Sequence, residues 1–207
     1  MENVKDIDGN SYKTVRIGDQ IWMAENFRVT HYSNGDRIPN LTDGNDWVNT
    51  EDGAYCNYEN EKNYVETYGR LYNWFAVNDK RRLAPKGWHI PTDEEWNELE
   101  YYLGGPEVAG GKLKSIGTIT NRDGLWNKYT FVEEGGTDES GFTALPGGWR
   151  TNDSGEFCIM GSYCYFWSST EGKSKYAYNR ILEFGRSLID RMQYYKRCGF
   201  SVRCVKD

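Results

Sequence analysis

Short runs of alternating apolar and polar residues, separated by turn residues, open the chain. Tyr12 to Ile17 alternates, and Gln20 to Met23 begins a second run of the same kind. Asp8-Gly9-Asn10 and Gly18-Asp19 precede and separate these runs, and such pairs favour tight turns. The pattern predicts an antiparallel β-meander in the N-terminal part of the sequence.

The next part of the chain has a loop composition before a helical pattern begins. Residues 33 to 65 are dense in Asn, Asp, Gly and Glu, which is typical of irregular surface loops. Within them, Gly53 to Tyr58 (GAYCNY) is a candidate strand. Apolar residues then recur at helical spacing over Tyr68 to Asp79, which predicts a short amphipathic helix.

A second helix is predicted from both its start signal and its end signal. Thr92 is the expected N-cap, and Glu95, three residues later, completes a capping box. We therefore interpret Thr92 as a cap rather than as a catalytic or phosphate-binding threonine. Gly104-Gly105 ends the helix. Its buried stripe is expected to consist of Trp96, Leu99, Tyr102 and Leu103.

After Gly110 the pattern predicts only short strands and turns, and no linker or repeat divides the chain. We therefore expect a single domain over residues 1–207. Gly147-Gly148 is interpreted as a tight turn that buries Trp149 near the helix carrying Trp96. The candidate strands are Leu113 to Ile116, Thr143 to Leu145, Phe166 to Ser169, Ala177 to Phe184 and Ser201 to Val205.

The composition narrows the class of protein. An aromatic content of 15% argues against disorder and favours a core filled with large rings. The net charge of −6 argues against a nucleic-acid partner, which would favour a basic face. No apolar run approaches the ~20 residues that cross a bilayer, so no membrane insertion of this segment is expected. The first ten residues lack a signal-peptide core, so the protein is either cytoplasmic or begins after a removed export signal.

Metal and cofactor sites are not predicted. Five cysteines without a CxxC pair, together with two histidines, argue against zinc, and we expect mostly buried thiols. A disulfide between Cys198 and Cys204 is left open, because geometry decides it. An acidic loop could hold a cation, although a solvated polar loop is the favoured interpretation; its residues are Asp43, Asp46, Glu51 and Asp52.

The tail over residues 163–198 is the candidate recognition surface, because Tyr and Arg, which dominate binding hot spots, are frequent in it. Strand alternation places Arg180 and Leu182 on a core face, with Arg180 paired to a buried carboxylate. The other face, with Asn179, Ile181 and Glu183, is expected to be exposed. An apolar and aromatic patch would then be formed by exposed Ile181, Phe184, Leu188, Tyr194 and Tyr195. The candidate ligand-binding residues are Tyr163, Tyr165, Asn179, Ile181, Phe184, Arg186, Leu188, Asp190, Tyr194, Tyr195 and Arg197.

The chain resembles a known family in a series of ordered motifs. They are DIDGNSYKTVRIGDQIWMAENF, GAYCNY, YGRLYNWFAV, APKGWHIPTDEEW, AGGKLK, SGFTALPGGWR, FWSSTE and GFSVRCVKD. These resemble the Fibrobacter succinogenes major paralogous domain of the C-type lectin-like fold group. The resemblance implies an α+β domain in which two helices flank a twisted antiparallel sheet, with long loops and adjacent termini. It also implies a location at the cell surface, outside the cell or on a virion.

Several functions stay open at this point. The first is a non-catalytic domain that binds an unknown protein or glycan through the tail, like the variable proteins of diversity-generating retroelements. In that case, positions such as Glu183 and Met192, which adenine mutagenesis does not yield, would be fixed. The second is an oxidase of the formylglycine-generating type, which IPTDEEW resembles, although the pair of nearby cysteines is missing. The third is a structural role in surface assembly.

Two further kinds of site are not supported by motifs. The tripeptides with which lectins of this fold group bind calcium do not occur, and neither do glycine motifs that bind phosphate.

Overall fold

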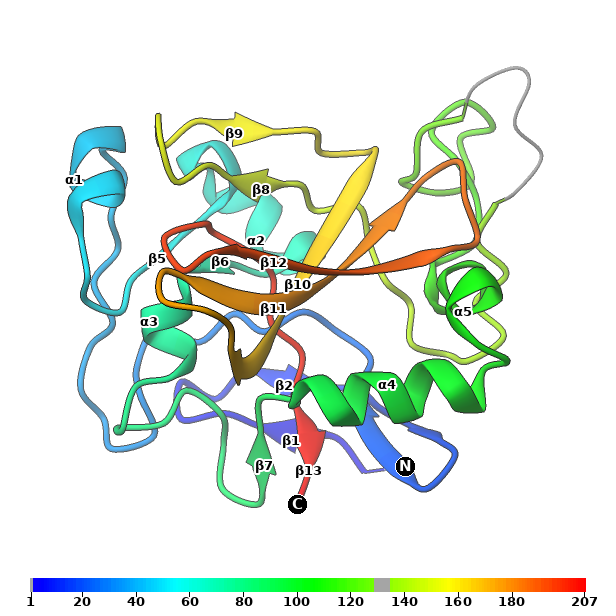
Figure 1. Cartoon of the computed structure of the whole chain (residues 1–207), viewed down its shortest axis with the longest axis horizontal. Coiled ribbons are helices and arrows are strands. Elements are labelled where there is room, and N and C mark those ends of the chain that lie inside the picture. Colours follow the sequence, from blue (N-terminus) through cyan, green and yellow to red (C-terminus); the bar gives the residue numbers. More distant parts are fainter. Residues whose placement is uncertain (1, 129–134) are drawn as a thin grey trace.

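Two antiparallel sheets and a few short helices form the frame of the molecule (Figure 1). The computed structural model describes residues 2–128 and 135–207. A three-stranded sheet has the order β10-β11-β12, and a four-stranded sheet has the order β3-β4-β13-β7. Their strands are β3 (Thr14–Ile17), β4 (Gln20–Met23), β7 (Trp88–His89), β10 (Tyr163–Glu171), β11 (Tyr176–Glu183), β12 (Ile189–Tyr195) and β13 (Val205–Lys206).

The remaining elements are short and cover these sheets. Three two-stranded pairs are β1 (Val4–Lys5) with β2 (Ser11–Tyr12), β5 (Tyr55–Cys56) with β6 (Leu71–Tyr72), and β8 (Trp149–Arg150) with β9 (Phe157–Cys158). The helices are α1 (Gly44–Asn49), α2 (Val65–Tyr68), α3 (Trp74–Val77), α4 (Asp93–Tyr102) and α5 (Pro106–Leu113), with 3₁₀ turns at Tyr58–Asn60 and Lys62–Tyr64. The fold is therefore mixed, with several antiparallel sheets and few helices.

The N-terminal meander and α4 confirm the local sequence signals. In the capping box, the Glu95 amide donates to Thr92 Oγ1 over 3.2 Å, and the Thr92 amide donates to Glu95 Oε2 over 2.8 Å. Trp96, Leu99 and Leu103 are buried, as expected. Tyr102 is 65% exposed, so its predicted burial is wrong. Glu100, which is charged, occupies the buried stripe because it pairs with Arg180 of β11.

Helix α5 was not predicted, and the strand expected at Leu113 to Ile116 is wrong because Leu113 ends this helix. Two central glycines lower helix propensity, but they let α5 approach the β11–β12 turn. A Cβ atom on Gly110 would lie 2.5 Å from the Leu188 carbonyl oxygen. Of the helix predicted over Tyr68 to Asp79, Trp74–Val77 is helical, and Tyr68 is the last residue of α2. Between them, Leu71–Tyr72 forms β6.

Of two further strand predictions, one is wrong and one is only partly correct. Thr143 to Leu145 forms no strand: Thr143 has a φ of 56°, and Ala144 makes only an isolated bridge to Lys114. Within Ser201 to Val205, only Val205 belongs to a strand, β13, which runs on to Lys206. The preceding residues still serve the fold, because the Ser201 carbonyl accepts the Trp167 amide over 3.1 Å.

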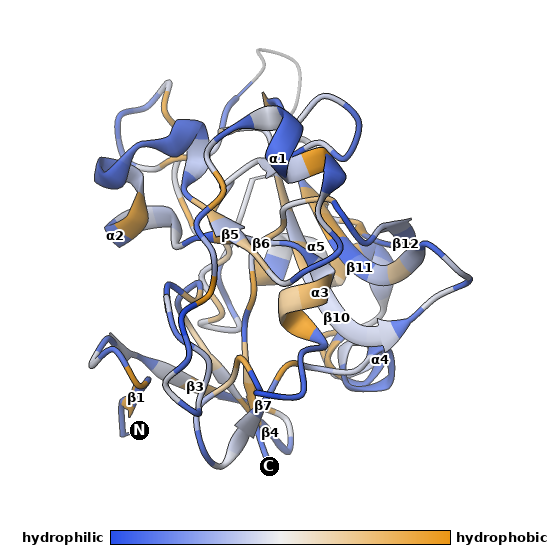
Figure 2. Cartoon of the chain, turned by 90° about the vertical axis from the view of Figure 1, so that its left-hand side faces the viewer, coloured by the Kyte–Doolittle hydropathy of each residue, from blue (hydrophilic) through white to orange (hydrophobic). Residues whose placement is uncertain are grey.

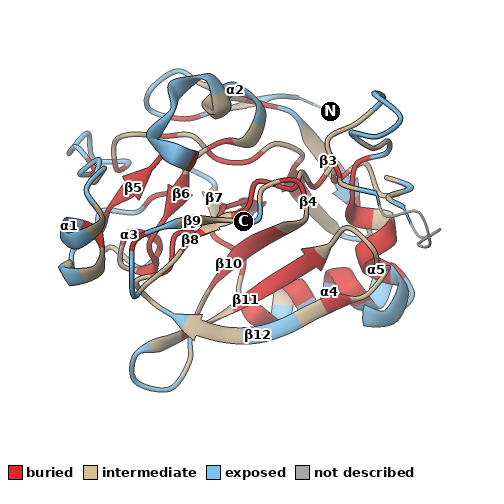
Figure 3. Ribbon diagram, turned by 90° about the horizontal axis from the view of Figure 1, so that it is seen from above, coloured by how far each residue is buried: buried red, intermediate tan, exposed pale blue. Residues whose placement is uncertain are grey.

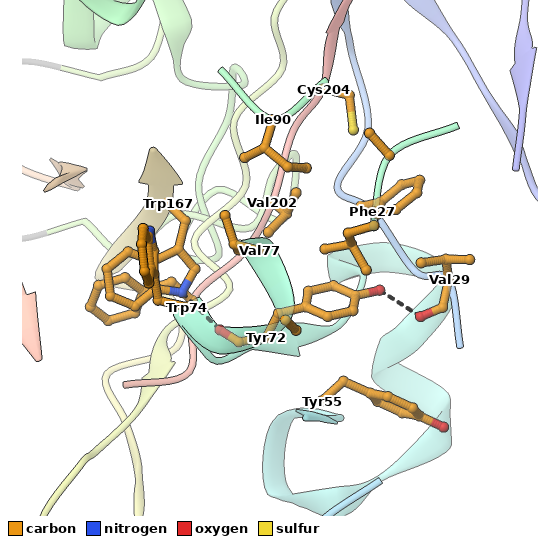
Figure 4. Close-up of a cluster of buried hydrophobic side chains, with 14 of the residues drawn as sticks. Phe27, Val29, Tyr55, Tyr72, Trp74, Val77, Ile90, Trp167, Val202 and Cys204 are labelled. Atoms are coloured by element: carbon orange, nitrogen blue, oxygen red, sulfur yellow. Dashed lines mark hydrogen bonds between the residues drawn. The ribbon is translucent and has the colours of Figure 1, made fainter. Parts of the chain in front are cut away.

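Buried aromatic rings hold the elements together. In the cluster of Figure 4, the Trp167 indole donates to the Tyr72 carbonyl, and the Tyr72 hydroxyl donates to the Val29 carbonyl, each over 2.8 Å. A second cluster, around Trp96 and Phe166, lies under α4 and α5. Trp149 belongs to the first cluster and is only partly buried, so its predicted place beside Trp96 is wrong.

Candidate functional site

The strand register divides the side chains of the three-stranded sheet between two faces. Tyr165 pairs with Ile181, and Ile181 pairs with Asp190, so these three point to the same side. We call this side the outer face. Its members are Tyr163, Tyr165, Trp167, Ala177, Asn179, Ile181, Glu183, Asp190, Met192 and Tyr194. In Figure 1 the sheet lies between α4 on one side and the β8–β9 pair on the other.

The opposite, inner face packs against α4 and confirms the predicted role of Arg180. The Arg180 guanidinium is fully buried, donates to Asp93 over 2.7 Å and also pairs with Glu100. Arg191, on the next strand, donates to Asp93 over 2.7 Å. Burial opposes ionisation of Asp93, but the hydrogen bonds from Arg191 and Arg180 outweigh it and lower the pKa of the carboxyl.

Three of the candidate residues are buried on the outer face, so their predicted exposure is wrong. Tyr165 is 5% exposed, Asn179 0% and Ile181 7%. One reason is that β11 is the central strand. In addition, Trp149 and Phe200 pack against Tyr165, in the cluster that also contains Ile181. Figure 3 shows this gradient: β10 and β11 are largely buried, whereas β12 is intermediate or exposed.

Aromatic rings gather on the part of the outer face that stays accessible. We define the aromatic cluster as Trp149, Tyr163, Tyr165 and Tyr194. The Trp149 ring lies 5.4 Å from that of Tyr165 and 5.8 Å from that of Tyr194, between centroids. Tyr163 stacks on Tyr165 at 6.2 Å. All but Tyr165 are partly exposed, so their edges can contact a ligand.

A charged turn adjoins the aromatic cluster. The exposed Arg186 guanidinium lies 2.6 Å from Glu183 and 2.9 Å from Asp190, which ties the ends of β11 and β12 together. The buried Lys114 amine donates to the carbonyls of Glu183 and Arg186, over 2.8 and 2.7 Å. This contact fixes the turn to the end of α5.

Four candidates lie away from the outer face. Phe184 packs against the cluster under α4 and α5, and the Leu188 carbonyl lies against α5. Tyr195 points to the inner side, where its ring lies 4.5 Å from that of Tyr176. Arg197 lies beyond β12 and pairs with Glu51 over 2.6 Å. The structure therefore does not bring the eleven predicted residues into one site.

Three residues on or against the outer face were missed as site residues. Trp149 was assigned to another part of the core, and Glu183 and Met192 were set aside as fixed positions. Met192 is 48% exposed. Strand alternation had placed Glu183 on the face of Ile181, but Glu183 was left out of the candidates because adenine mutagenesis does not yield Glu. The sequence carries no signal that brings Trp149, from a separate strand pair, onto this face.

The thiols show no exposed reactive pair. All five cysteines are free, so Cys198 and Cys204 do not form a disulfide. Burial raises the pKa of the Cys204 thiol and of the Cys198 thiol well above their usual value. Cys158 is half-buried, whereas the other four cysteines are buried.

The side chains of two of the four acidic loop residues have partners within the chain. Asp43 caps α1 by accepting the amides of Asn45 and Asp46, while Glu51 pairs with Arg197. Within residues 2–128 and 135–207, no cluster of three metal-binding side chains occurs. In the same residues, no helix has the length and apolar character to span a membrane.

Comparison with known proteins identifies one family. No curated protein and no solved structure gives a significant match. Residues 15–206 match the family described as the Fibrobacter succinogenes major domain, a range that contains α4, the outer face and β13. This match confirms the family predicted from the ordered motifs. The chain therefore belongs to the Fibrobacter succinogenes major domain family.

Proposed function

We propose that the protein is a non-catalytic, adhesin-like or receptor-like domain that binds a protein or glycan on its outer face. The observation that carries this proposal is the convergence of tail residues on one face, where an aromatic cluster adjoins a charged turn. Aromatic and Arg side chains supply most of the energy at binding hot spots. The site would comprise Trp149, Tyr163, Glu183, Arg186, Asp190, Met192 and Tyr194.

The scaffold beneath this face supports the proposal because it is rigid. Arg180 and Arg191 fix β11 and β12 to Asp93 at the start of α4. Lys114 fixes the turn that carries Arg186. A surface held in one conformation loses little entropy on binding, which favours affinity.

The proposed scaffold is C-type lectin-like. This proposal is supported by two helices that pack on one face of an antiparallel sheet, and by the loop-rich region that precedes them. It is also supported by β13, at one end of the chain, which pairs with β4 near the other end.

An oxidase of the formylglycine-generating type finds little support by comparison. That chemistry needs a thiolate, and burial raises the pKa of the thiols in the tail. A structural role in surface assembly would require contacts between copies of the chain. Sedimentation over a range of concentrations tests this alternative, because a binding domain can remain monomeric.

A retroelement origin of the tail is part of the proposal. Tyr163, Arg186, Asp190 and Tyr194 are of the residue types that adenine mutagenesis yields, whereas Glu183 and Met192 are not. The test is the neighbouring DNA. A reverse transcriptase gene beside a near-copy of the tail's coding sequence that differs at adenines would support diversification. Absence of both from the complete genome would reject it.

Binding is tested by screening the chain on glycan and surface-protein arrays and measuring the best hit by calorimetry. Tyr194→Ala and Asp190→Ala should each lower affinity by about tenfold or more if they are hot spots. The control is Tyr101→Ala. Tyr101 is 86% exposed and belongs to α4, which packs on the inner face of the sheet and not on the outer face. Unchanged affinity in both outer-face variants would reject the site.

A further inference from the structure

A small pocket lies beyond the end of β12, and its lining contains Tyr195 and Arg197, two of the four candidates that lie away from the outer face. It has a volume of about 150 Å³, and its lining includes Glu51, Phe75, Lys175, Tyr195, Lys196 and Arg197. Phe75 comes from α3, an apolar segment among hydrophilic loops in Figure 2. We call this the β12-end pocket.

The lining is positively charged in a chain whose net charge is −6. Lys175, Lys196 and Arg197 contribute three cations, against one carboxylate from Glu51. The local charge therefore favours an anionic ligand, in contrast to the protein as a whole.

Two of these cations are held in place by contacts other than their ion pairs. The Lys196 ammonium lies 4.8 Å from the centre of the Trp74 ring, and its side chain is only 12% exposed. Arg197 Nε donates to the Thr50 carbonyl over 3.1 Å. Removal of the acidic partners would leave both cations where they are.

The acidic partners are much more exposed than the cations. Glu51 pairs with Arg197 and is 76% exposed, and Glu171 pairs with Lys196 and is 60% exposed. Such pairs contribute only about 0–1 kcal/mol, so a ligand can displace them at small cost. The Glu51 carboxylate occupies the position that a ligand carboxylate would take on Arg197.

The volume of the pocket and the aromatic rings in its lining indicate which class of carboxylate ligand fits. Pockets for drug-sized ligands measure about 300–1,000 Å³, so the β12-end pocket suits a single small ring. The Phe75 and Tyr195 rings in its lining offer flat apolar surfaces to the ring face of a sugar. A second hollow of about 440 Å³ shares Glu51 and Phe75 and gives room for a longer chain.

We propose that the β12-end pocket binds the carboxylate-bearing ring of an acidic sugar of the hexuronic acid type. The ligand carboxylate replaces Glu51 on Arg197, Lys175 and Lys196 add positive charge, and the sugar ring packs against Phe75 and Tyr195. This site is separate from the outer face, so the two proposals stand or fall independently.

The test uses methyl glucuronide, with methyl glucoside as the uncharged matched probe, titrated into ¹⁵N-labelled protein and followed by NMR. The glucuronide should shift the amides around Tyr195 and Arg197, and the glucoside should not. Arg197→Gln should weaken binding about tenfold or more, because a charge-assisted contact is lost. Glu51→Gln should tighten it by up to about fivefold, because the competing carboxylate is gone.

Tyr101→Ala is the control, and thermal melts check that each variant is folded. Equal binding of glucoside and glucuronide would overturn the proposal, as would a Glu51→Gln variant that binds no tighter. A short diglutamate peptide is the third probe. If it binds in the pocket and the glucuronide does not, the sugar assignment is wrong and the ligand is an acidic peptide.

Discussion

Arg180 Nη1 of β11 lies 2.7 Å from Asp93 Oδ1 at the start of α4, and both side chains are buried. The same guanidinium also pairs with Glu100, which lies about two turns further along the same face of α4. This network joins the helix with the strongest local signal to the sheet that carries the outer face. It is therefore the contact on which the position of the candidate site depends most.

Replacement of Arg180 should unfold the protein at much lower denaturant. Arg180→Met leaves Asp93 with Arg191 only and Glu100 as an unpaired buried carboxylate, a loss of about 3–5 kcal/mol in the free energy of unfolding. Urea titration followed by tryptophan fluorescence measures it. Lys112→Met, which removes an exposed pair with Glu139, should cost no more than about 1 kcal/mol. Similar losses in the two variants would contradict the buried network.

The Thr92 cap can be tested apart from any chemical role. Thr92→Ala removes the acceptor for the Glu95 amide and should cost about 0.5–2 kcal/mol of stability. Thr92→Ser keeps the hydroxyl and should recover most of this loss. Equal stability of all three chains in urea would show that the capping box contributes nothing.

Replacement of Gly110 by alanine has two opposing effects on stability, and the size of each is known. Alanine inside a helix is favoured over glycine by about 1 kcal/mol. A Cβ at this position, however, would meet the Leu188 carbonyl at 2.5 Å, and overpacking costs about 1–3 kcal/mol. We therefore expect Gly110→Ala to be destabilising in urea titrations.

Gly111→Ala is the matched control in the same helix. Its new methyl group would lie 2.7 Å from Ser187 Oγ and 3.2 Å from Ser187 Cβ, so it would meet a side chain and not the backbone carbonyl that faces Gly110. It should cost less than Gly110→Ala or be neutral. A stabilising Gly110→Ala would show that α5 does not depend on its close approach to the β11–β12 turn.

These contacts also explain which features the sequence could predict. The N-terminal meander, the capping box and the division of Arg180 from Ile181 follow from short-range rules, and all three are found. Burial of Asn179 and Ile181 was not predictable in this way. Alternation tells which residues share a face, but burial depends on the central place of β11 in the sheet and, for Ile181, on a cluster with Trp149 and Phe200.

Helix α5 was not predicted from the sequence for a related reason. Pro106 at its start is a favourable signal, but Gly110 and Gly111 argue against a helix. Only the turn that packs against them explains their presence. Tyr195 and Arg197 were likewise predicted as part of one tail surface, and only the packing of α3 and of Glu51 beside them places them in the lining of a separate pocket.

Thiol labelling distinguishes the cysteines by burial. Under native conditions a thiol reagent should modify Cys158 and leave the four buried thiols unreacted until denaturant is added. Burial and the nearby Glu156 and Asp153 raise the pKa of Cys158, so its labelling should quicken as pH rises. Cys158→Ser should abolish native labelling. Rapid native labelling of Cys204 would contradict its place in the core.

His89 should make stability depend on pH. Its Nε2 lies 2.7 Å from Glu95, the capping-box acid, and its Nδ1 lies 2.7 Å from Asp207. Burial opposes protonation, but the hydrogen bonds to Asp207 and Glu95 outweigh it and raise the pKa of His89 above 6.5. Because the folded-state pKa is raised, the contribution is complete below pH 6.5 and is lost as pH rises through the folded-state pKa.

The matched variant is His89→Gln, which keeps hydrogen-bonding groups but cannot take up the charge. At about pH 5.5 the wild type should melt at a higher temperature than this variant. The difference in the free energy of unfolding should be no more than about 1 kcal/mol, because the ring is partly exposed. The difference should shrink towards about pH 9. A gap that is constant with pH, or that widens as pH rises, would mean that protonated His89 does not support the start of α4.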